Sequence, residues 1–75
     1  MTDSGDSLMI QVSINGEQKE VAEHLNLSQL LAQLELNPMY LAVEVNRVLI
    51  PRKQHAEYQL QPNDQLEIVT LVGGG

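Results

Sequence analysis

The amino-acid sequence predicts an α+β domain in which one main helix packs on one face of a mixed β-sheet. Two patterns support this prediction. Apolar residues alternate with polar ones in several short segments, which is typical of strands, and in one segment they recur at helical spacing. The expected order is strand, strand, helix, strand, strand, strand. A chain of 75 residues has room for one domain of this kind.

The first part of the domain is expected to form a β-hairpin. Apolar residues alternate with polar ones over 8–14, and Asn15-Gly16 follows. This dipeptide favours a type I′ turn because both central residues of such a turn need positive φ. The return strand, expected over 17–21, is polar, so we place it at an edge of the sheet.

The helix is predicted over 27–36. Its apolar stripe consists of Leu27, Leu30, Leu31 and Leu34. Asn26 is the expected N-cap, with Gln29 completing a capping box. At the other end, Asn37 is expected to adopt the left-handed conformation that often ends helices, and Pro38 prevents continuation. The leucine stripe predicts that this helix packs on the sheet.

Three further strands are expected in the second half of the chain. They cover residues 41–45, 48–50 and about 65–71. Tight turns are expected at Asn46-Arg47 and at Pro62-Asn63-Asp64. The segment 52–60 is polar and is expected to be irregular or to include one helical turn, with Tyr58 and Leu60 packed on the core.

The last predicted strand is apolar on both faces. Leu66 and Ile68 share one face, whereas Val69 and Leu71 share the other. Because a single helix can cover only one face of the sheet, Val69, Leu71 and the following Val72 are a candidate docking surface for a partner. A central strand packed on both sides would show the same pattern, and the sequence does not distinguish these two interpretations.

The composition argues against several functional classes. Ten acidic residues against four basic ones give a net charge of −6, so a nucleic-acid backbone would be repelled. The chain has no cysteine, which excludes disulfides and a thiol nucleophile. No apolar stretch is long enough to span a membrane. Residues 1–7 lack the features of a signal peptide, so we expect a disordered leader on a cytoplasmic protein.

The residues show no pattern of a catalytic or metal site. His24 and His55 lack the spacing of two ligands on one helical turn, and both are expected in solvated loops. Ser28 has no neighbouring His or Lys in motif spacing and is expected in the first turn of the helix. A small basic cluster, either a solvated turn or a contact patch for an acidic partner, consists of Arg47, Arg52 and Lys53. We therefore expect no enzyme activity and no bound metal.

The sequence ends on Gly73, Gly74 and Gly75, directly after the last predicted strand. Without a Cβ these residues can lie in a narrow channel, and three extended residues reach about 10–11 Å. They are either a flexible end without function, or an arm in which Gly73 and Gly74 thread into a partner's active site and Gly75 presents its carboxylate. Such a carboxylate must be activated, for instance as an acyl-adenylate made with ATP, before sulfur or nitrogen can attack it.

Several stretches of the chain occur together in one known family. They are the Asn15-Gly16 hairpin, the Leu30-Leu31 helix, the stretches 45–52, 55–58 and 66–70, and the final Val72-Gly73-Gly74-Gly75. In order and spacing they resemble the ThiS family of sulfur carriers of thiamine biosynthesis, over about residues 8–75. The family usually has Gly-Asp before the last strand, where this chain has Asn63-Asp64, and Asn also tolerates a left-handed turn.

The resemblance implies a β-grasp, ubiquitin-like fold, with the domain at 8–72 and a flexible glycine tail at 73–75. It also implies that a ThiF-type adenylyltransferase adenylates Gly75 with Mg-ATP. Sulfur from cysteine, mobilised by a cysteine desulfurase or a sulfurtransferase, would then give a thiocarboxylate, from which the thiazole synthase ThiG takes the sulfur. We expect a monomeric co-substrate that binds no cofactor itself, since ThiF would hold the nucleotide and the magnesium.

Three alternatives share part of this pattern. The small subunit of molybdopterin synthase has the same thiocarboxylate chemistry, but its family tends to have prolines before the final glycines, where this chain has Thr70-Leu71-Val72. A ubiquitin-like modifier joined to protein lysines would share the chemistry as far as adenylation. A structural module with an accidental glycine end is disfavoured by the combination of fold pattern and tail.

Overall fold

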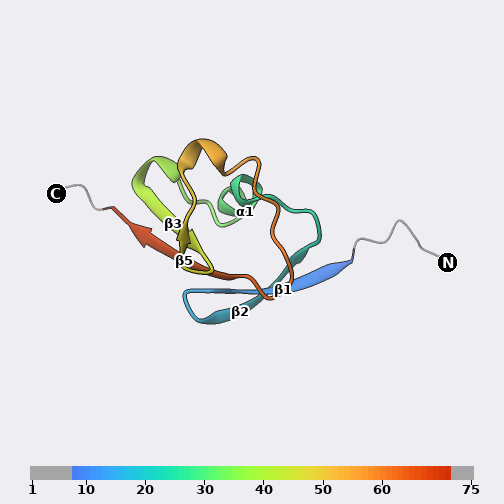
Figure 1. Ribbon diagram of the computed structural model, residues 1–75. Coiled ribbons are helices and arrows are strands. Elements are labelled where there is room, and N and C mark those ends of the chain that lie inside the picture. Colours follow the sequence, from blue (N-terminus) through green and yellow to red (C-terminus); the bar gives the residue numbers. More distant parts are fainter. Residues whose placement is uncertain (1–7, 72–75) are drawn as a thin grey trace.

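Five strands and one α-helix make up the described part of the protein, which comprises residues 8–71 of the computed structural model (Figure 1). In chain order the elements are β1 (Met9–Ile14), β2 (Glu17–Ala22), α1 (Leu27–Gln33), β3 (Leu41–Val45), β4 (Val48–Leu49) and β5 (Gln65–Thr70). Two 3₁₀-helices, η1 (Pro38–Tyr40) and η2 (Arg52–Gln54), lie in the connections. The predicted order of strands and helix is confirmed. The predicted leader at 1–7 lies outside the described residues.

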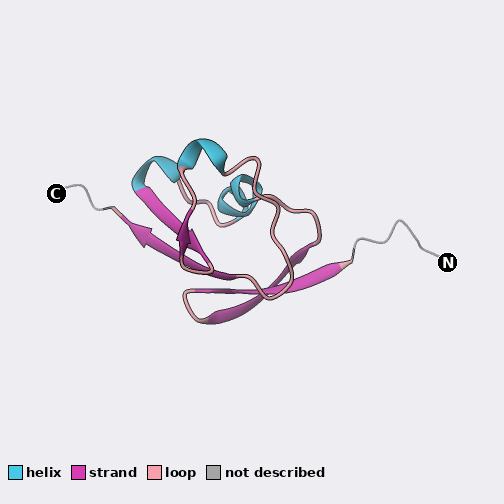
Figure 2. Ribbon diagram, viewed as in Figure 1, coloured by secondary structure: helices cyan, strands magenta, loops and turns pink. Residues whose placement is uncertain are grey.

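The strands form one mixed sheet in the order β2-β1-β5-β3-β4. β5 lies in the centre, parallel to β1 and antiparallel to β3. The polar strand β2 lies at one edge, as predicted, and β4 lies at the other. Figure 2 shows the helical segments on one side of the sheet, with no described helix on the opposite side. The sheet therefore has one covered face and one open face.

Both tight turns between antiparallel strands lie at the predicted positions, and the type I′ conformation predicted for Asn15-Gly16 is confirmed. Asn15 and Gly16 have φ of 52° and 87°, and Asn46 and Arg47 have φ of 52° and 71°. Positive φ at both central residues is the signature of a type I′ turn, whose twist matches that of the flanking strands. These turns fix the registers of the β1–β2 and β3–β4 pairs.

The N-terminus of α1 has the predicted capping box. Asn26 Oδ1 accepts a hydrogen bond from Gln29 N at 2.7 Å, and Asn26 N donates to Gln29 Oε1 at 2.9 Å. Two backbone amides that the first helical turn would leave free are thereby satisfied.

The predicted C-terminus of the helix is wrong. The helix ends at Gln33, and Glu35, with φ of 59°, takes the left-handed position expected for Asn37. Leu36 N donates to Leu31 O at 2.9 Å and Glu35 N to Ala32 O at 3.0 Å, which is the bonding pattern of a Schellman motif. The chain turns early because Leu36 folds back to pack against the core. Asn37 instead caps η1 by accepting from Met39 N at 2.9 Å.

The core lies between α1 and the inner face of the sheet. Its buried apolar residues are Val12, Val21, Leu25, Leu27, Leu30, Leu31, Leu41, Val43, Val45, Leu60 and Leu66. The alternating strand residues and the helical stripe therefore meet as predicted. None of the helices described in residues 8–71 is long and apolar enough to cross a membrane.

The connection between β4 and β5 packs against the N-terminus of α1. Leu27 N donates to Tyr58 O at 2.9 Å, and Ser28 N donates to His55 O at 3.2 Å. These bonds bring His55 into the interior, where it is 3% exposed, so the prediction of a solvated His55 is wrong. Its Nε2–H donates to Ile50 O at 3.1 Å, because a carbonyl can only accept. His24 is exposed, as predicted.

Candidate functional site

The candidate site is the C-terminal end of β5 together with the open face beside it. Figure 1 shows that β5, drawn in red, runs from the centre of the molecule to its periphery. Leu71 N donates to Tyr40 O at 2.7 Å, so pairing with the β3 side continues to the last described residue. The predicted site residues Val72, Gly73, Gly74 and Gly75 lie outside the described residues. The structure therefore defines the base from which they continue.

The turn residue Asn15 holds the middle of β5 on its β1 side. Asn15 N donates to Leu66 O at 2.9 Å, at the point where β1 has ended. Beyond it, Ile68 N donates to Asn15 Oδ1 at 2.8 Å, and Asn15 Nδ2 donates to Ile68 O at 3.2 Å. A side-chain amide thus replaces one further residue of a strand, satisfying both backbone groups of Ile68.

The turn residue Asn46 holds the start of β5 on the other side. Asn46 N donates to Gln65 O at 2.7 Å, and Gln65 N donates to Asn46 Oδ1 at 3.0 Å. Asn46 Nδ2 also donates to Asp64 Oδ1 at 2.9 Å. The two asparagine turns therefore fix β5 from both sides before the chain reaches Leu71.

Asp64 is the buried polar centre of this arrangement, with 5% of its surface exposed. Its Oδ2 accepts from Tyr58 O–H at 2.8 Å and from Gln61 N at 2.9 Å, while Oδ1 accepts from Asn46. Burial of the phenol, followed by its hydrogen bond to Asp64 and the charge of that carboxylate, raises the pKa of Tyr58 to about 12. The Asp64 network is structural, because it ties the loop before β5 to the β3–β4 turn.

Residues 8–71 contain no group of three His, Cys, Asp or Glu side chains arranged to hold a metal ion. The two histidines do not come together, since His24 is exposed and His55 is buried among core residues. A groove beside the β1–β2 hairpin is open to solvent and is lined by Ile14, Asn15, Glu17, Gln18, Lys19 and Leu34. The basic residues Arg47, Arg52 and Lys53 are all exposed.

At the C-terminal end of β5, the side chains on the open face of the sheet are exposed. Val69 and Leu71 are 53% and 52% exposed, whereas Leu66 on the covered face is 1% exposed. Val69 lies opposite Ala42 of β3. Of the two interpretations that the sequence allowed for this strand, the structure selects the uncovered one. Val69 and Leu71 form an exposed apolar surface at the base of the glycine tail.

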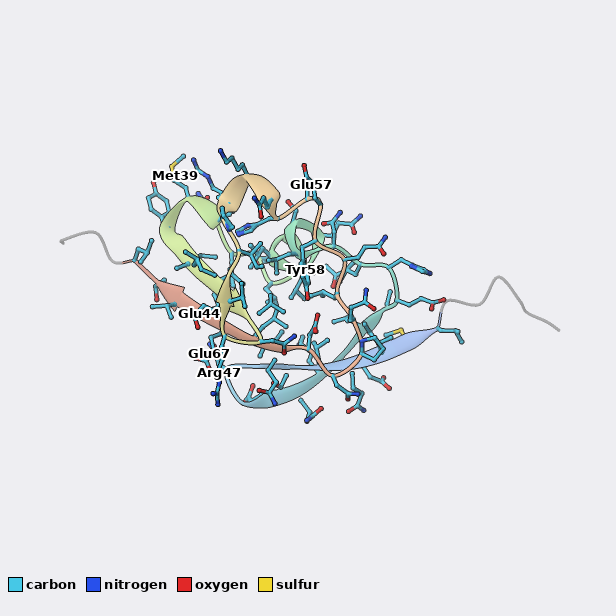
Figure 3. The ribbon with its side chains drawn as sticks, in the orientation of Figure 1. Met39, Glu44, Arg47, Glu57, Tyr58 and Glu67 are labelled. Carbon is cyan, nitrogen blue, oxygen red and sulfur yellow. The ribbon has the colours of Figure 1, made fainter. Side chains whose placement is uncertain are left out.

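An acidic pair adjoins this apolar surface. Glu44 of β3 lies directly opposite Glu67 of β5, and both are exposed (Figure 3). On its other side Glu44 lies opposite Leu49 of β4, which is 58% exposed. Within residues 8–71, no Lys or Arg side chain forms an ion pair with either glutamate. The open face therefore combines apolar side chains with two adjacent negative charges.

Comparison with known proteins agrees with this architecture. The ThiS family matches residues 12–75, which include all of the candidate site. The chain belongs to the ThiS family. A solved structure of the thiamine biosynthesis protein ThiS from Geobacter metallireducens superposes with a TM-score of 0.77 at 29% identity, covering 88% of this chain and 100% of that one. The β-grasp fold expected from the resemblance is thereby confirmed.

Three curated relatives show how the ThiS-like segment occurs elsewhere. The uncharacterized protein ycf40 of Porphyra purpurea is 38% identical over 66 residues, covering 88% of this chain and 93% of its own length. The sulfur carrier protein ThiS of Escherichia coli is 27% identical and is covered completely. A thiazole synthase of Paramagnetospirillum magneticum is 32% identical over 66 residues, which span 20% of that protein.

Sequence reasoning missed the residues that hold this ThiS-family site in place. Asn15, Asn46 and Asp64 were expected only as turn residues. The side chains of Asn15 and Asn46 bond to the backbone of β5, and the side chain of Asp64, directly before β5, accepts from Asn46 and from two groups of the preceding loop. Their shared signal is an Asn or Asp at a turn between apolar strands, a residue type whose side chain readily bonds backbone groups. The acidic pair was also missed, because its two members are far apart in the sequence.

Proposed function

We propose that this chain is a sulfur carrier that works through the carboxylate of Gly75. The observation that carries the proposal is the match to the ThiS family over residues 12–75, which includes the glycine tail. One of the relatives in this family is named a sulfur carrier protein. The described domain contributes no catalytic centre of its own to this proposal; it positions a reactive end for other enzymes.

The chemistry begins with activation of an unreactive carboxylate. A ThiF-type adenylyltransferase holds Mg-ATP, and a carboxylate oxygen of Gly75 attacks the α-phosphate with loss of pyrophosphate. A sulfur nucleophile, supplied from cysteine by a cysteine desulfurase or a sulfurtransferase, then attacks the acyl carbon. AMP leaves. When the nucleophile is a persulfide, an acyl disulfide forms first. A thiol then cleaves its S–S bond, which releases the thiocarboxylate and leaves the donor's sulfur in a disulfide with that thiol. Glycine suits this position because no side chain obstructs attack on its carbonyl carbon.

A ThiG-type thiazole synthase is the proposed acceptor of the sulfur. In the thiazole synthases of Paramagnetospirillum magneticum and Magnetococcus marinus, a segment similar to this chain makes up 20% of the protein. A carrier-like segment within the same polypeptide as the synthase supports a partnership between the two. This observation favours the thiazole pathway over the molybdopterin and protein-modifier alternatives.

Docking is assigned to the open face next to the tail. Val69 and Leu71 are exposed apolar residues on a strand whose position is fixed by Asn15 and Asn46. A partner that accepts the tail must approach the end of β5, so it can cover these residues at the same time. Val72, the third member of the predicted docking surface, lies outside the described residues.

The acceptor experiment tests the proposal. The thiocarboxylate form of the chain is offered separately to ThiG with its other substrates and to the large subunit of molybdopterin synthase with its precursor. We expect sulfur transfer to ThiG, and no transfer from a matched chain that lacks Gly75. Transfer only to the molybdopterin synthase subunit would replace the proposed function by that alternative. Equal circular dichroism spectra of the two chains would show that deletion of Gly75 leaves the fold intact.

A further inference from the structure

We propose that the open face recognises its activating enzyme through a basic side chain of that enzyme, which enters between Glu44 and Glu67. The inference rests on the proposed function, because the enzyme that takes the tail must lie beside this face. It adds the chemistry of recognition: a Lys or Arg that contacts both carboxylates, set among apolar side chains that contact Val69, Leu71 and Leu49. Glu44 and Glu67 are then specificity-determining residues.

The acidic pair of Glu44 and Glu67 does nothing favourable for the isolated fold. Residues directly opposite each other on neighbouring strands have Cβ atoms about 4.5–5.5 Å apart, and like charges there are destabilising. Glu44 and Glu67 are such a pair. Arg47 lies in the adjacent turn (Figure 3), yet neither glutamate forms an ion pair with it or with any other basic residue within 8–71. A cation from outside the described chain would turn this repulsion into attraction.

The acidic pair also lies next to the exposed apolar residues that precede the tail. On the open face, Glu67 and Val69 of β5 and Leu71 directly after the strand follow one another at every second residue. Glu67 therefore lies about 7 Å along the strand from Val69. Leu49 borders the pair on the β4 side. Apolar contact around the pair would exclude water and strengthen an ion pair formed there. One partner surface can therefore cover the acidic pair and the apolar residues together.

Charge also decides which kind of partner fits. A second copy of this chain would bring its own glutamates against Glu44 and Glu67 in a symmetric contact, and each chain carries a net charge of −6. Self-association through this face is therefore opposed by electrostatics. A partner with a basic side chain at its centre is favoured, and charge complementarity of this kind mainly sets association rate and specificity.

The test compares docking with fold stability in the same variants. Glu67→Gln and Glu44→Gln, alone and together, keep the shape of the side chains and remove their charge. Glu20→Gln is the matched control, because Glu20 is also exposed on the open face, on β2 opposite Gln11. The assay is ATP–pyrophosphate exchange catalysed by the ThiF-type adenylyltransferase, with the carrier concentration varied at low and at high salt, beside thermal unfolding of each carrier.

For the double variant we expect a rise of about tenfold in the KM for the carrier at low salt, corresponding to about 1.4 kcal/mol. The exchange rate at saturation should stay unchanged, since the tail is untouched. The difference should shrink at high salt. Thermal stability should be equal or higher, because a repulsive pair has been removed. Loss of a merely structural pair would instead lower stability and leave KM unchanged.

The outcomes separate this inference from the proposed function. Exchange with the wild-type carrier but a KM for the double variant within twofold of wild type would overturn the inference alone. An equal rise of KM in Glu20→Gln would also overturn it, because any negative charge would then suffice. Absence of exchange with the wild-type carrier would overturn the proposed function and the inference with it. Wild-type dimers that dissociate in the double variant would assign the face to self-association instead.

Discussion

Replacement of Asp64 by asparagine should lower the free energy of unfolding by about 2 kcal/mol. The carboxylate accepts three hydrogen bonds: two at Oδ2, from Tyr58 and Gln61, and one at Oδ1, from Asn46. Asparagine has one acceptor oxygen and one NH₂ group, so in either orientation at least one of these donors faces another donor. A hydrogen bond to a charged group contributes about 1.5–3 kcal/mol, and Asp64 is only 5% exposed.

This loss is large for a small domain. At roughly 0.05–0.15 kcal/mol per residue, a chain of 75 residues has a total stability of about 4–11 kcal/mol. Urea unfolding followed by far-UV circular dichroism measures the change, with Tyr58→Phe as the matched control. That variant removes one donor and leaves the carboxylate two others, so we expect a loss of about 1 kcal/mol. The double variant should show coupling between the two sites.

A loss below about 0.5 kcal/mol for Asp64→Asn would refute this reasoning, because it would mean that the buried carboxylate can be replaced without an unpaired donor. A loss of similar size for Asp64→Asn and Tyr58→Phe, with full coupling, would place the whole effect in the single bond between them. In that case the hydrogen bonds of Asn46 and Gln61 to Asp64 would contribute nothing to stability, and the Asn46 turn alone would hold the start of β5.

Two further predictions concern Tyr58 and the end of α1. With a pKa of about 12, Tyr58 in the folded protein keeps its proton above pH 10, where the tyrosine of the unfolded chain loses it. The contribution of Tyr58 to the free energy of unfolding is therefore fully present below pH 10 and is lost as pH rises through about 12. Ultraviolet titration of the Tyr40→Phe variant, in which Tyr58 is the remaining tyrosine, should show a midpoint near 12, and a midpoint near 10 would contradict this prediction. Glu35→Gly should raise the free energy of unfolding, measured by urea unfolding, by about 0.5–1 kcal/mol, because φ of 59° at this position suits glycine. The control variant Ala32→Gly, within α1, should lower the free energy of unfolding by about 1 kcal/mol. A lower free energy of unfolding for Glu35→Gly would contradict the left-handed end of the helix.

Elements specified by neighbouring residues could be predicted from the sequence. The capping box of Asn26 and Gln29, the type I′ turn at Asn15-Gly16 and the leucine stripe of α1 depend on spacings of one to four residues, and all three are confirmed. Alternation of apolar residues was enough to find the strands. The polarity of β2 predicted its position at an edge of the sheet, whereas the central position of β5 is seen only in the folded structure.

Features that depend on distant contacts could not be predicted. The helix ends at Gln33 because Leu36 packs back on the core. Without knowing that Leu36 is buried, a reader of the sequence has no local signal that Glu35, and not Asn37, takes the left-handed conformation. His55 is buried because the amide of Ser28, 27 positions earlier in the chain, bonds to its carbonyl. The bonds between Asn15 and Ile68 join residues 53 positions apart.

The candidate site shows the same division. The sequence indicated that Val69 and Leu71 share a face of the last strand, but only the sheet order shows that this face is uncovered. Glu44 and Glu67 become neighbours through the register of β3 with β5, which no single-sequence pattern specifies. The proposed role of Gly73, Gly74 and Gly75 rests on the family match and the chemistry of a glycine carboxylate, since these residues lie outside the described part of the chain.

The intact mass of the chain after the complete activation reaction tests the sulfur-carrier proposal most directly. The chain is incubated with a ThiF-type adenylyltransferase, Mg-ATP, a cysteine desulfurase and cysteine, and a parallel sample lacks ATP. We predict a mass increase equal to the replacement of one oxygen by one sulfur, located at Gly75 by fragmentation and absent without ATP. An unchanged mass, or sulfur on any other residue, would contradict the proposal.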